Sequence, residues 1–144
     1  MDLTYGLEIV DLALMEDMPH GDVTTENIFT GTEEPVTATL KTREQCVVAG
    51  YPVMDRICDH FPDIQVSPFR KDGEPARPDE VILSLEGSPA DILKIERTLL
   101  NFLQRLSAIA TRTHDVVRML DGSTIRLLDT RKTAPGMRAL EKYA

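Results

Sequence analysis

One periodic stretch near the C-terminal end constrains the fold more than any other feature of the chain. Over residues 92–120, apolar residues recur at three- and four-residue spacing, which is typical of an amphipathic α-helix that Ser88 could cap. A continuous helix over residues 89–120 would be about 48 Å long, whereas a compact globule of this size is about 37 Å across. We therefore expect the helix to bend, to split near Ser107-Ala108, or to run from one domain into another.

The other face of this expected helix is polar but carries little charge. Arg97, Asn101, Gln104 and Thr111 fall at helical spacing, and Arg97 is the only charged member. A solvent-exposed helix face usually carries pairs of Glu and Lys. The stripe is therefore consistent either with a face that meets a partner of defined hydrogen-bonding geometry or with an ordinary polar surface.

The segments before the long helix predict an α+β fold. Helical spacing predicts helices over Leu3–Leu14 and Tyr51–His60, and the acidic segment 16–25 predicts a turn. Residues 71–78, with their Pro and Gly, predict a loop. Alternating or short apolar runs predict four strands, at residues 36–40, 46–49, 64–69 and 81–85.

A cluster of cations and hydroxyls lies near the C-terminal end. Residues 125–129 predict a strand and residues 136–143 predict a helix, so they would form a β/α unit joined by Thr130-Arg131-Lys132-Thr133. In α/β folds, ligands bind at the carboxyl ends of strands. Arg offers a planar fork to a carboxylate, and Lys offers a compact charge to a phosphate. The cluster suits anionic oxygens, although basic residues are also common at solvated strand ends.

The charge of the chain is unevenly distributed. The chain has 144 residues, enough for one domain with its own core, and a net charge of −8. Residues 1–40 contain nine acids and no Lys or Arg, whereas residues 122–144 contain five basic residues and two acids. An acidic protein is not expected to bind nucleic acid, because such binding requires a basic face. The basic C-terminal end indicates a site for anionic small molecules.

Membrane and metal sites are not expected from the composition. No run approaches the roughly 18 apolar residues of a membrane-spanning helix, and we see no signal sequence, so we expect a cytoplasmic protein. Cys46 and Cys58 lack the spacing of a metal motif, and we expect them to be buried, reduced thiols. We assign no metal ligand in this chain because its His and Cys residues are scattered.

Three motifs in the chain resemble those of the quinolinate phosphoribosyltransferases, also called nicotinate-nucleotide pyrophosphorylases (carboxylating). The resemblance follows the order of the family's motifs and covers the N-terminal half of its members. The motifs are Glu16-Asp17 with Gly21-Asp22-Val23-Thr24-Thr25; the run from Glu96-Arg97-Thr98 to Ser107 with Ile109-Ala110-Thr111; and Asp129-Thr130-Arg131-Lys132-Thr133 with Pro135-Gly136-Met137-Arg138 and Glu141-Lys142-Tyr143-Ala144.

The resemblance implies a fold and a division into domains. Residues 1–107 would form an N-terminal α/β sandwich domain of about four strands with helices. A long bent helix would then lead into residues 108–144, the first β/α unit of an incomplete, here truncated, α/β barrel. The rest of the active site would lie in the half that this chain does not contain, so we expect the fragment alone to be inactive.

The resemblance also implies an activity. Such enzymes transfer the phosphoribosyl group of phosphoribosyl pyrophosphate to quinolinate with decarboxylation, giving nicotinate mononucleotide in de novo NAD biosynthesis. By the matching motif, Thr130 and Arg131 would hold quinolinate carboxylates. Lys132 would be catalytic and would face substrate phosphate or carboxylate oxygens. Mg²⁺ would be bound with phosphoribosyl pyrophosphate, and Arg97 would reach across the interface of a homodimer or higher homo-oligomer.

The resemblance leaves other roles open. For Glu16, Asp22 and Thr24 of the first motif we expect a structural role rather than a catalytic one. Two alternative functions also remain. The chain could be part of a related phosphoribosyltransferase-like protein linked to molybdenum uptake, or a non-catalytic dimerisation module that supplies residues to a partner chain.

Overall fold

The computed structural model describes residues 3–31 and 33–144, and its helices and strands form the α+β fold that the sequence predicts. Residues 1, 2 and 32 of the predicted N-terminal domain lie outside the described residues. In chain order the elements are α1 (Thr4–Asp17), α2 (Val23–Ile28), β1 (Val36–Lys41), β2 (Cys46–Val47), α3 (Tyr51–His60), β3 (Gln65–Pro68), β4 (Pro75–Ala76), β5 (Val81–Gly87), α4 (Pro89–Met119) and α5 (Arg138–Tyr143).

The strands form two small antiparallel sheets. In the larger sheet β5 is central and pairs with β1 on one edge and β3 on the other, in the order β1-β5-β3. The smaller sheet pairs β2 with β4. A central strand has neighbours on both edges, which favours apolar residues, and in β5 both Leu83 and Leu85 are buried.

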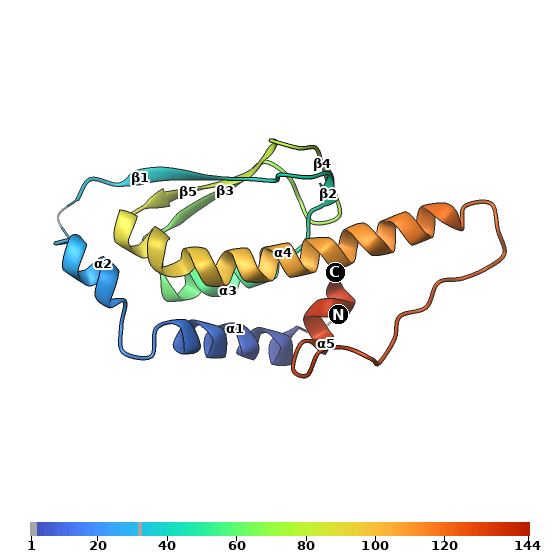
Figure 1. Ribbon diagram of the computed structural model, residues 1–144, viewed down its shortest axis with the longest axis horizontal. Coiled ribbons are helices and arrows are strands. Elements are labelled where there is room, and N and C mark those ends of the chain that lie inside the picture. The colour runs from blue at the N-terminus through green and yellow to red at the C-terminus, as the bar shows by residue number, and fades with distance from the viewer. Residues whose placement is uncertain (1–2, 32) are drawn as a thin grey trace.

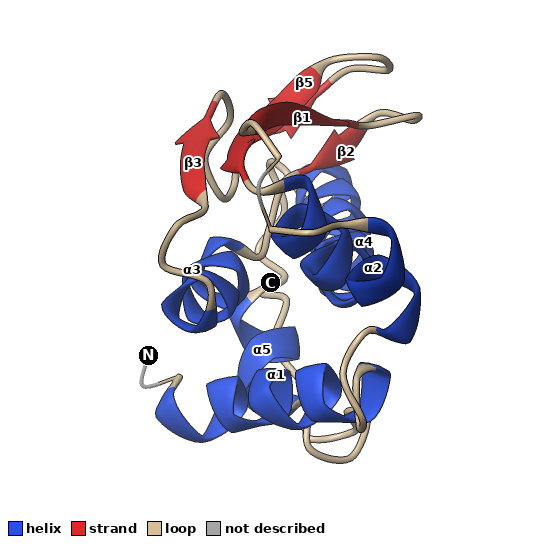
Figure 2. Ribbon diagram, turned by 90° about the vertical axis from the view of Figure 1, so that its left-hand side faces the viewer, coloured by secondary structure: helices blue, strands red, loops and turns tan. Residues whose placement is uncertain are grey.

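The helices are stacked beneath the larger sheet in two further layers (Figures 1 and 2). Helices α3 and α4 lie next to the strands, and α1 and α5 lie on the far side of these two helices. The core runs through all three layers, because α1, α3, α4 and α5 each bury apolar residues in it. Its fully buried members include Val10 of α1, Ile57 of α3, Leu83 of β5, Ile95 and Leu106 of α4, and Leu140 of α5.

Helix α4 is one uninterrupted helix of 31 residues, so the expected split near Ser107-Ala108 does not occur. Ser107 instead forms hydrogen bonds that join α4 to the segment just before α3. The Ser107 hydroxyl accepts from the N–H of Ala49 at 3.1 Å and contacts the Ala49 carbonyl at 3.3 Å. Beyond Ala110 the helix extends past the strands and is largely exposed (Figure 1).

The position between β2 and α3 at residue 50 requires a glycine, because the backbone there packs closely against α4. Gly50 has a φ of +134°, a region that favours glycine, and it faces α4. A Cβ at this position would lie 2.7 Å from Cδ2 of Leu103. The lack of a side chain at Gly50 therefore allows α3 to begin directly against α4.

The predicted strand at residues 125–129 is wrong, because this segment is extended without being part of any sheet. Its apolar side chains are exposed, Ile125 by 66% and Leu128 by 81%. A strand needs a neighbour to accept its backbone hydrogen bonds, and no described strand lies beside this segment. The helix after it is also shorter than predicted, and begins at Arg138 rather than Gly136.

Two short elements of the structure were not predicted from the sequence. Helix α2 lies in the segment predicted as an acidic turn, and β4 lies in the predicted loop 71–78. The carboxylate of Asp22 caps α2 by accepting from the N–H of Thr25 at 3.0 Å and from the Thr25 hydroxyl. Asp22 therefore has the structural role that we expected for the first motif.

Candidate functional site

The cationic loop, residues 129–134, presents its charged side chains to solvent. Thr130, Arg131 and Lys132 are all exposed, and the N–H of Lys132 donates to the hydroxyl oxygen of Thr130 at 3.1 Å. Within residues 3–31 and 33–144, neither Arg131 nor Lys132 forms a salt bridge. Both side chains therefore keep all their hydrogen-bond donors available for an anion.

The loop is placed by the helix that follows it. Helix α5 buries Leu140 completely and Met137 almost completely against the core. It also approaches α1 so closely that a Cβ on Gly6 would lie 2.7 Å from the Cβ of Ala139. The apolar face of α5 thus fixes the position at which the cationic loop ends, although no strand fixes its beginning.

Arg97 lies apart from the cationic loop. Its guanidinium group lies near the charges of Asp17, at the end of α1, and Asp22, just before α2. The chain leaves the other end of α4, at Met119, before it reaches the loop (Figure 1). Nη1 of Arg97 donates to Oδ1 of Asp17 at 2.8 Å, and this hydrogen bond raises the pKa of Arg97 above its usual value. The Arg97 side chain is nevertheless 74% exposed, so most of its guanidinium group remains accessible.

Part of the predicted polar stripe of α4 is exposed to solvent, and part of it contacts another element. Asn101 and Gln104 are exposed and line a shallow cavity of about 600 Å³ with Arg105 and Glu141. Thr111 instead faces β2, where its hydroxyl accepts from the N–H of Val47 at 2.8 Å. Arg97, Asn101 and Gln104 therefore form the open part of the stripe, whereas Thr111 is taken up by a contact within the fold.

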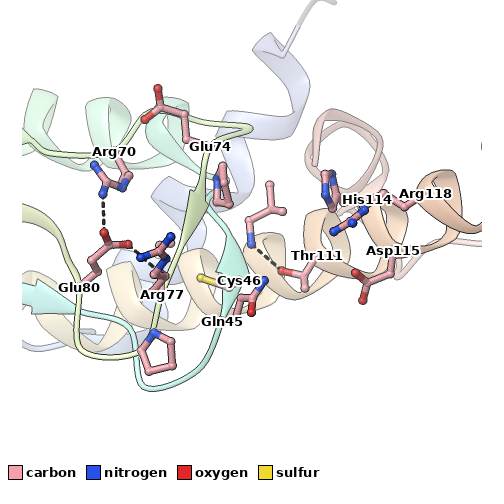
Figure 3. Close-up of a pocket in the computed structure, with 14 residues that line it drawn as sticks. Gln45, Cys46, Arg70, Glu74, Arg77, Glu80, Thr111, His114, Asp115 and Arg118 are labelled. Atoms are coloured by element: carbon pink, nitrogen blue, oxygen red, sulfur yellow. Dashed lines mark hydrogen bonds and ion pairs between the residues drawn. The ribbon is translucent and has the colours of Figure 1, made fainter.

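A larger groove of about 900 Å³ lies between the β2–β4 sheet and the exposed end of α4 (Figure 3). Its charges are mixed, because the cations Arg70, Arg77 and Arg118 share it with acidic side chains. Arg70 is neutralised by Glu80 at 2.5 Å. No predicted site residue lines this groove, and its lining comes from separate chain segments, so no contiguous motif could have revealed it.

Other site chemistry is limited in the described part of the chain. Residues 3–31 and 33–144 contain no group of three or more His, Cys, Asp or Glu that could hold a metal ion. Cys46 and Cys58 are free thiols, as predicted, but each is only half-buried. Burial raises the pKa of Cys58, which disfavours its reactive thiolate form. Among the described residues, no helix combines the length and apolar character needed to cross a membrane.

Two family models match successive parts of the chain. Residues 22–107 match the N-terminal domain of quinolinate phosphoribosyl transferase, and residues 109–144 match its C-terminal domain. The chain is 40% identical over 133 residues to a probable nicotinate-nucleotide pyrophosphorylase (carboxylating) of Bacillus subtilis, covering 90% of this chain and 45% of that protein. It is also 40% identical to the chloroplastic enzyme of that name from Arabidopsis thaliana, covering 98% of this chain and 40% of that protein.

Solved structures of nicotinate-nucleotide pyrophosphorylases also resemble this chain over about half of their length. The nicotinate-nucleotide pyrophosphorylase of Francisella tularensis superposes with a TM-score of 0.91 at 32% identity, over 99% of this chain and 51% of that one. The enzyme of the same name from Ehrlichia chaffeensis superposes with a TM-score of 0.88 at 36% identity, over 94% and 50% of the two chains. The chain thus spans about half the length of the relatives that it matches.

Proposed function

Because the chain belongs to the quinolinate phosphoribosyltransferase family, we propose that it is part of an enzyme that makes nicotinate mononucleotide. In this reaction the ring nitrogen of quinolinate attacks C1 of phosphoribosyl pyrophosphate, and pyrophosphate leaves with the bonding electrons. The neighbouring carboxylate is then lost as carbon dioxide, and a proton takes its place on the ring. The observation that carries the proposal is the match to both family domains, in order, over residues 22–144.

The exposed cations of the loop suit these substrates. Quinolinate and phosphoribosyl pyrophosphate are both multiply anionic, so bringing them together costs electrostatic repulsion that fixed cations must offset. We assign Arg131 and Thr130 to the carboxylates of quinolinate, because a guanidinium fork matches a carboxylate. Lys132 is assigned a catalytic role at phosphate or carboxylate oxygens. The absence of any salt bridge to Arg131 or Lys132 in the described part of the chain supports these assignments.

A second subunit would complete the site. We propose a homodimer or higher homo-oligomer in which Arg97 enters the site of the partner. Two observations support this role: Arg97 is 74% exposed, and its guanidinium group contacts Asp17 at the end of α1 rather than a residue of the cationic loop. Among the residues that the structure describes, Arg97 donates only to Asp17, which leaves its remaining guanidinium donors for a substrate anion.

Two further parts of the proposal concern Mg²⁺ and location. We propose that Mg²⁺ is bound with phosphoribosyl pyrophosphate in the complete enzyme, because the hard oxygens of a pyrophosphate group suit this ion. We also propose a cytoplasmic location. No observation favours a role in molybdenum uptake or a purely dimerising module over the proposed enzyme.

The test uses the complete protein that contains this chain. Mixed with quinolinate, phosphoribosyl pyrophosphate and Mg²⁺, it should form nicotinate mononucleotide, whereas a lack of product at every protein concentration would refute the proposal. Removing a preorganised cation costs about 2–4 kcal/mol, so Arg131→Ala should lower kcat/KM by roughly a hundredfold. Calorimetry should show weaker quinolinate binding and a smaller change for phosphoribosyl pyrophosphate. The exposed Arg43 provides the control, and Arg43→Ala should retain the parent's activity.

A further inference from the structure

Two consecutive residues of α5 hold the two ends of the cationic loop. Nζ of Lys142 lies 2.5 Å from Oδ2 of Asp129, the first residue of the loop. Oε2 of Glu141 accepts from the N–H of Ala134, the last residue of the loop, at 3.3 Å. The cationic loop, which carries Arg131, is therefore bound at both ends by residues from a single turn of α5.

Glu141 also joins the loop to the long helix. Its other oxygen, Oε1, accepts from Nε of Arg105 at 3.0 Å and from Nη2 of the same guanidinium group. The Glu141 side chain is only 11% exposed, whereas Arg105 is 49% exposed, so the carboxylate is the more enclosed partner of these charge-assisted bonds. One carboxylate thus connects Arg105 of α4 with the backbone of Ala134.

Helix α5 is firmly held in the fold. Leu140 is fully buried, and the hydroxyl of Tyr143 donates to Oδ2 of Asp72 at 2.6 Å. Asp72 in turn accepts from the N–H groups of Gly50 and Tyr51 at the start of α3. Movement of α5 would break contacts to three other parts of the molecule, so the helix can act as a fixed support.

We propose that Glu141 and Lys142 are positioning residues, which set the conformation of the cationic loop without touching substrate. The inference rests on the proposed function, in which Arg131 and Lys132 bind the substrates. An exposed loop with long side chains would lose much conformational entropy on binding an anion. Fixing both ends of its backbone before the substrate arrives reduces that loss. It also holds the two cations in a geometry ready for binding.

The test compares Glu141→Gln and Lys142→Gln with the parent in the complete protein. A Gln at position 141 keeps the shape, but its NH₂ group must face one of the two donors that the carboxylate now accepts from. Asp91→Asn is the matched control, because it removes another Lys–Asp pair, with Lys94 at 3.5 Å, at the far end of α4. Trypsin provides the structural readout, since it cleaves after Arg131 and Lys132, and calorimetry provides the dissociation constant of quinolinate.

We expect both variants to be cleaved in the loop about tenfold faster and to bind quinolinate about tenfold more weakly, the effect of losing one charge-assisted hydrogen bond. Asp91→Asn should change neither quantity. Loop cleavage at the parent's rate in both variants would overturn the inference, and so would unchanged quinolinate binding where the parent binds it. If Glu141→Gln fails to fold, Lys142→Gln alone tests the inference. The contact of Lys142 with Asp129 lies nearer the surface, so its loss should not prevent folding.

The same experiment separates this inference from the proposed function. A parent that forms no nicotinate mononucleotide, together with variants whose loop is cleaved faster, would refute the enzyme and retain the support of the loop by α5. An active parent with unaltered cleavage in both variants would refute the support and retain the enzyme. Faster cleavage together with weaker quinolinate binding would uphold both.

Discussion

Two apolar stretches of this chain differ in structure: one forms a packed helix, and the other forms no regular element. In α4, the apolar face up to Ala110 is buried, and Ile95 and Leu106 are fully inaccessible. In the segment 120–137, Ile125 and Leu128 are mostly exposed. Each stretch has the apolar pattern of a regular element, but only α4 becomes one. A helix satisfies its backbone internally, whereas a strand depends on a neighbour.

The two regions also differ in what holds them. Burial of apolar side chains holds α4 and the sheet, because α4 shares one core cluster with β5 and α3. In the segment before α5 only the last few residues reach the core, through Ala134 and Met137, and polar contacts to Glu141 and Lys142 hold the two ends of the cationic loop. The contrast predicts that substitutions in the two regions will have very different effects on stability.

The largest expected effect is in the buried region. Leu106→Ala removes a side chain with 0% exposure from the middle of the core. A buried Leu→Ala change costs about 2–5 kcal/mol, from the lost transfer free energy and the cavity left behind. Urea unfolding should show this decrease in the free energy of unfolding. A loss below about 1 kcal/mol would mean that the α4 core is not packed as described.

A smaller effect is expected where the two regions meet. Asp72→Ala removes the acceptor for the hydroxyl of Tyr143 and for the N–H groups at the start of α3. The loss of a helix cap and of a charge-assisted bond should cost about 2 kcal/mol in unfolding free energy. Tyr143→Phe removes only the bond to α5, and should cost about half as much. Equal losses in the two variants would show that the capping of α3 contributes nothing.

The acid stability of the buried region should depend on Asp11. Its carboxylate accepts two bonds from Arg56, at 2.9 and 2.7 Å, and lies 2.9 Å from Nε2 of His60. The bonds from Arg56 are the main cause that holds the pKa of Asp11 below its usual value of 3.8.

The folded state therefore binds fewer protons at Asp11 than the unfolded state does. The stabilisation is complete above the unfolded pKa of 3.8 and is lost as the pH falls through the lower folded value. In Asp11→Asn, the free energy of unfolding should fall less steeply with pH below about 4. Equal slopes for parent and variant in acid titrations followed by circular dichroism would contradict this prediction.

The smallest effect is expected in the exposed segment. Leu128 is 81% exposed, so Leu128→Ser should change the free energy of unfolding by less than about 0.5 kcal/mol. Urea unfolding of this chain measures the change directly. A loss comparable with that of Leu106→Ala would show that the segment is packed in solution, and the contrast between the two regions would disappear.

Much of the fold could be predicted from the sequence where local signals are complete. Helix α3 has the predicted limits, Tyr51 to His60, because helical spacing and an early Pro52 both mark it. The six residues of α2 gave no periodic signal, and its cap at Asp22 depends on side-chain geometry. Strand β4 has only two residues and contains a proline, so only its pairing with β2 reveals it.

The candidate site was predicted in part. The motif identified the residue types of the cationic loop, and the structure shows that Arg131 and Lys132 are exposed and without salt bridges in the described part of the chain. Their roles toward substrate stay predictions. The support of the loop by Glu141 was not predicted, because its partner Arg105 lies 36 positions away in the sequence. Likewise, the contact of Thr111 with β2 spans 64 positions.

The sequence by itself determined which segments could be helical, which face of α4 would be apolar, and that two cations would stand together at residues 131 and 132. These properties are local, since they depend on spacing within a few turns. Only the tertiary structure decided that residues 125–129 do not form a strand, that α4 continues past Ser107, and that α5 holds the cationic loop. Strand pairing and side-chain contacts need partners from distant parts of the chain, and local spacing does not say where those partners will lie.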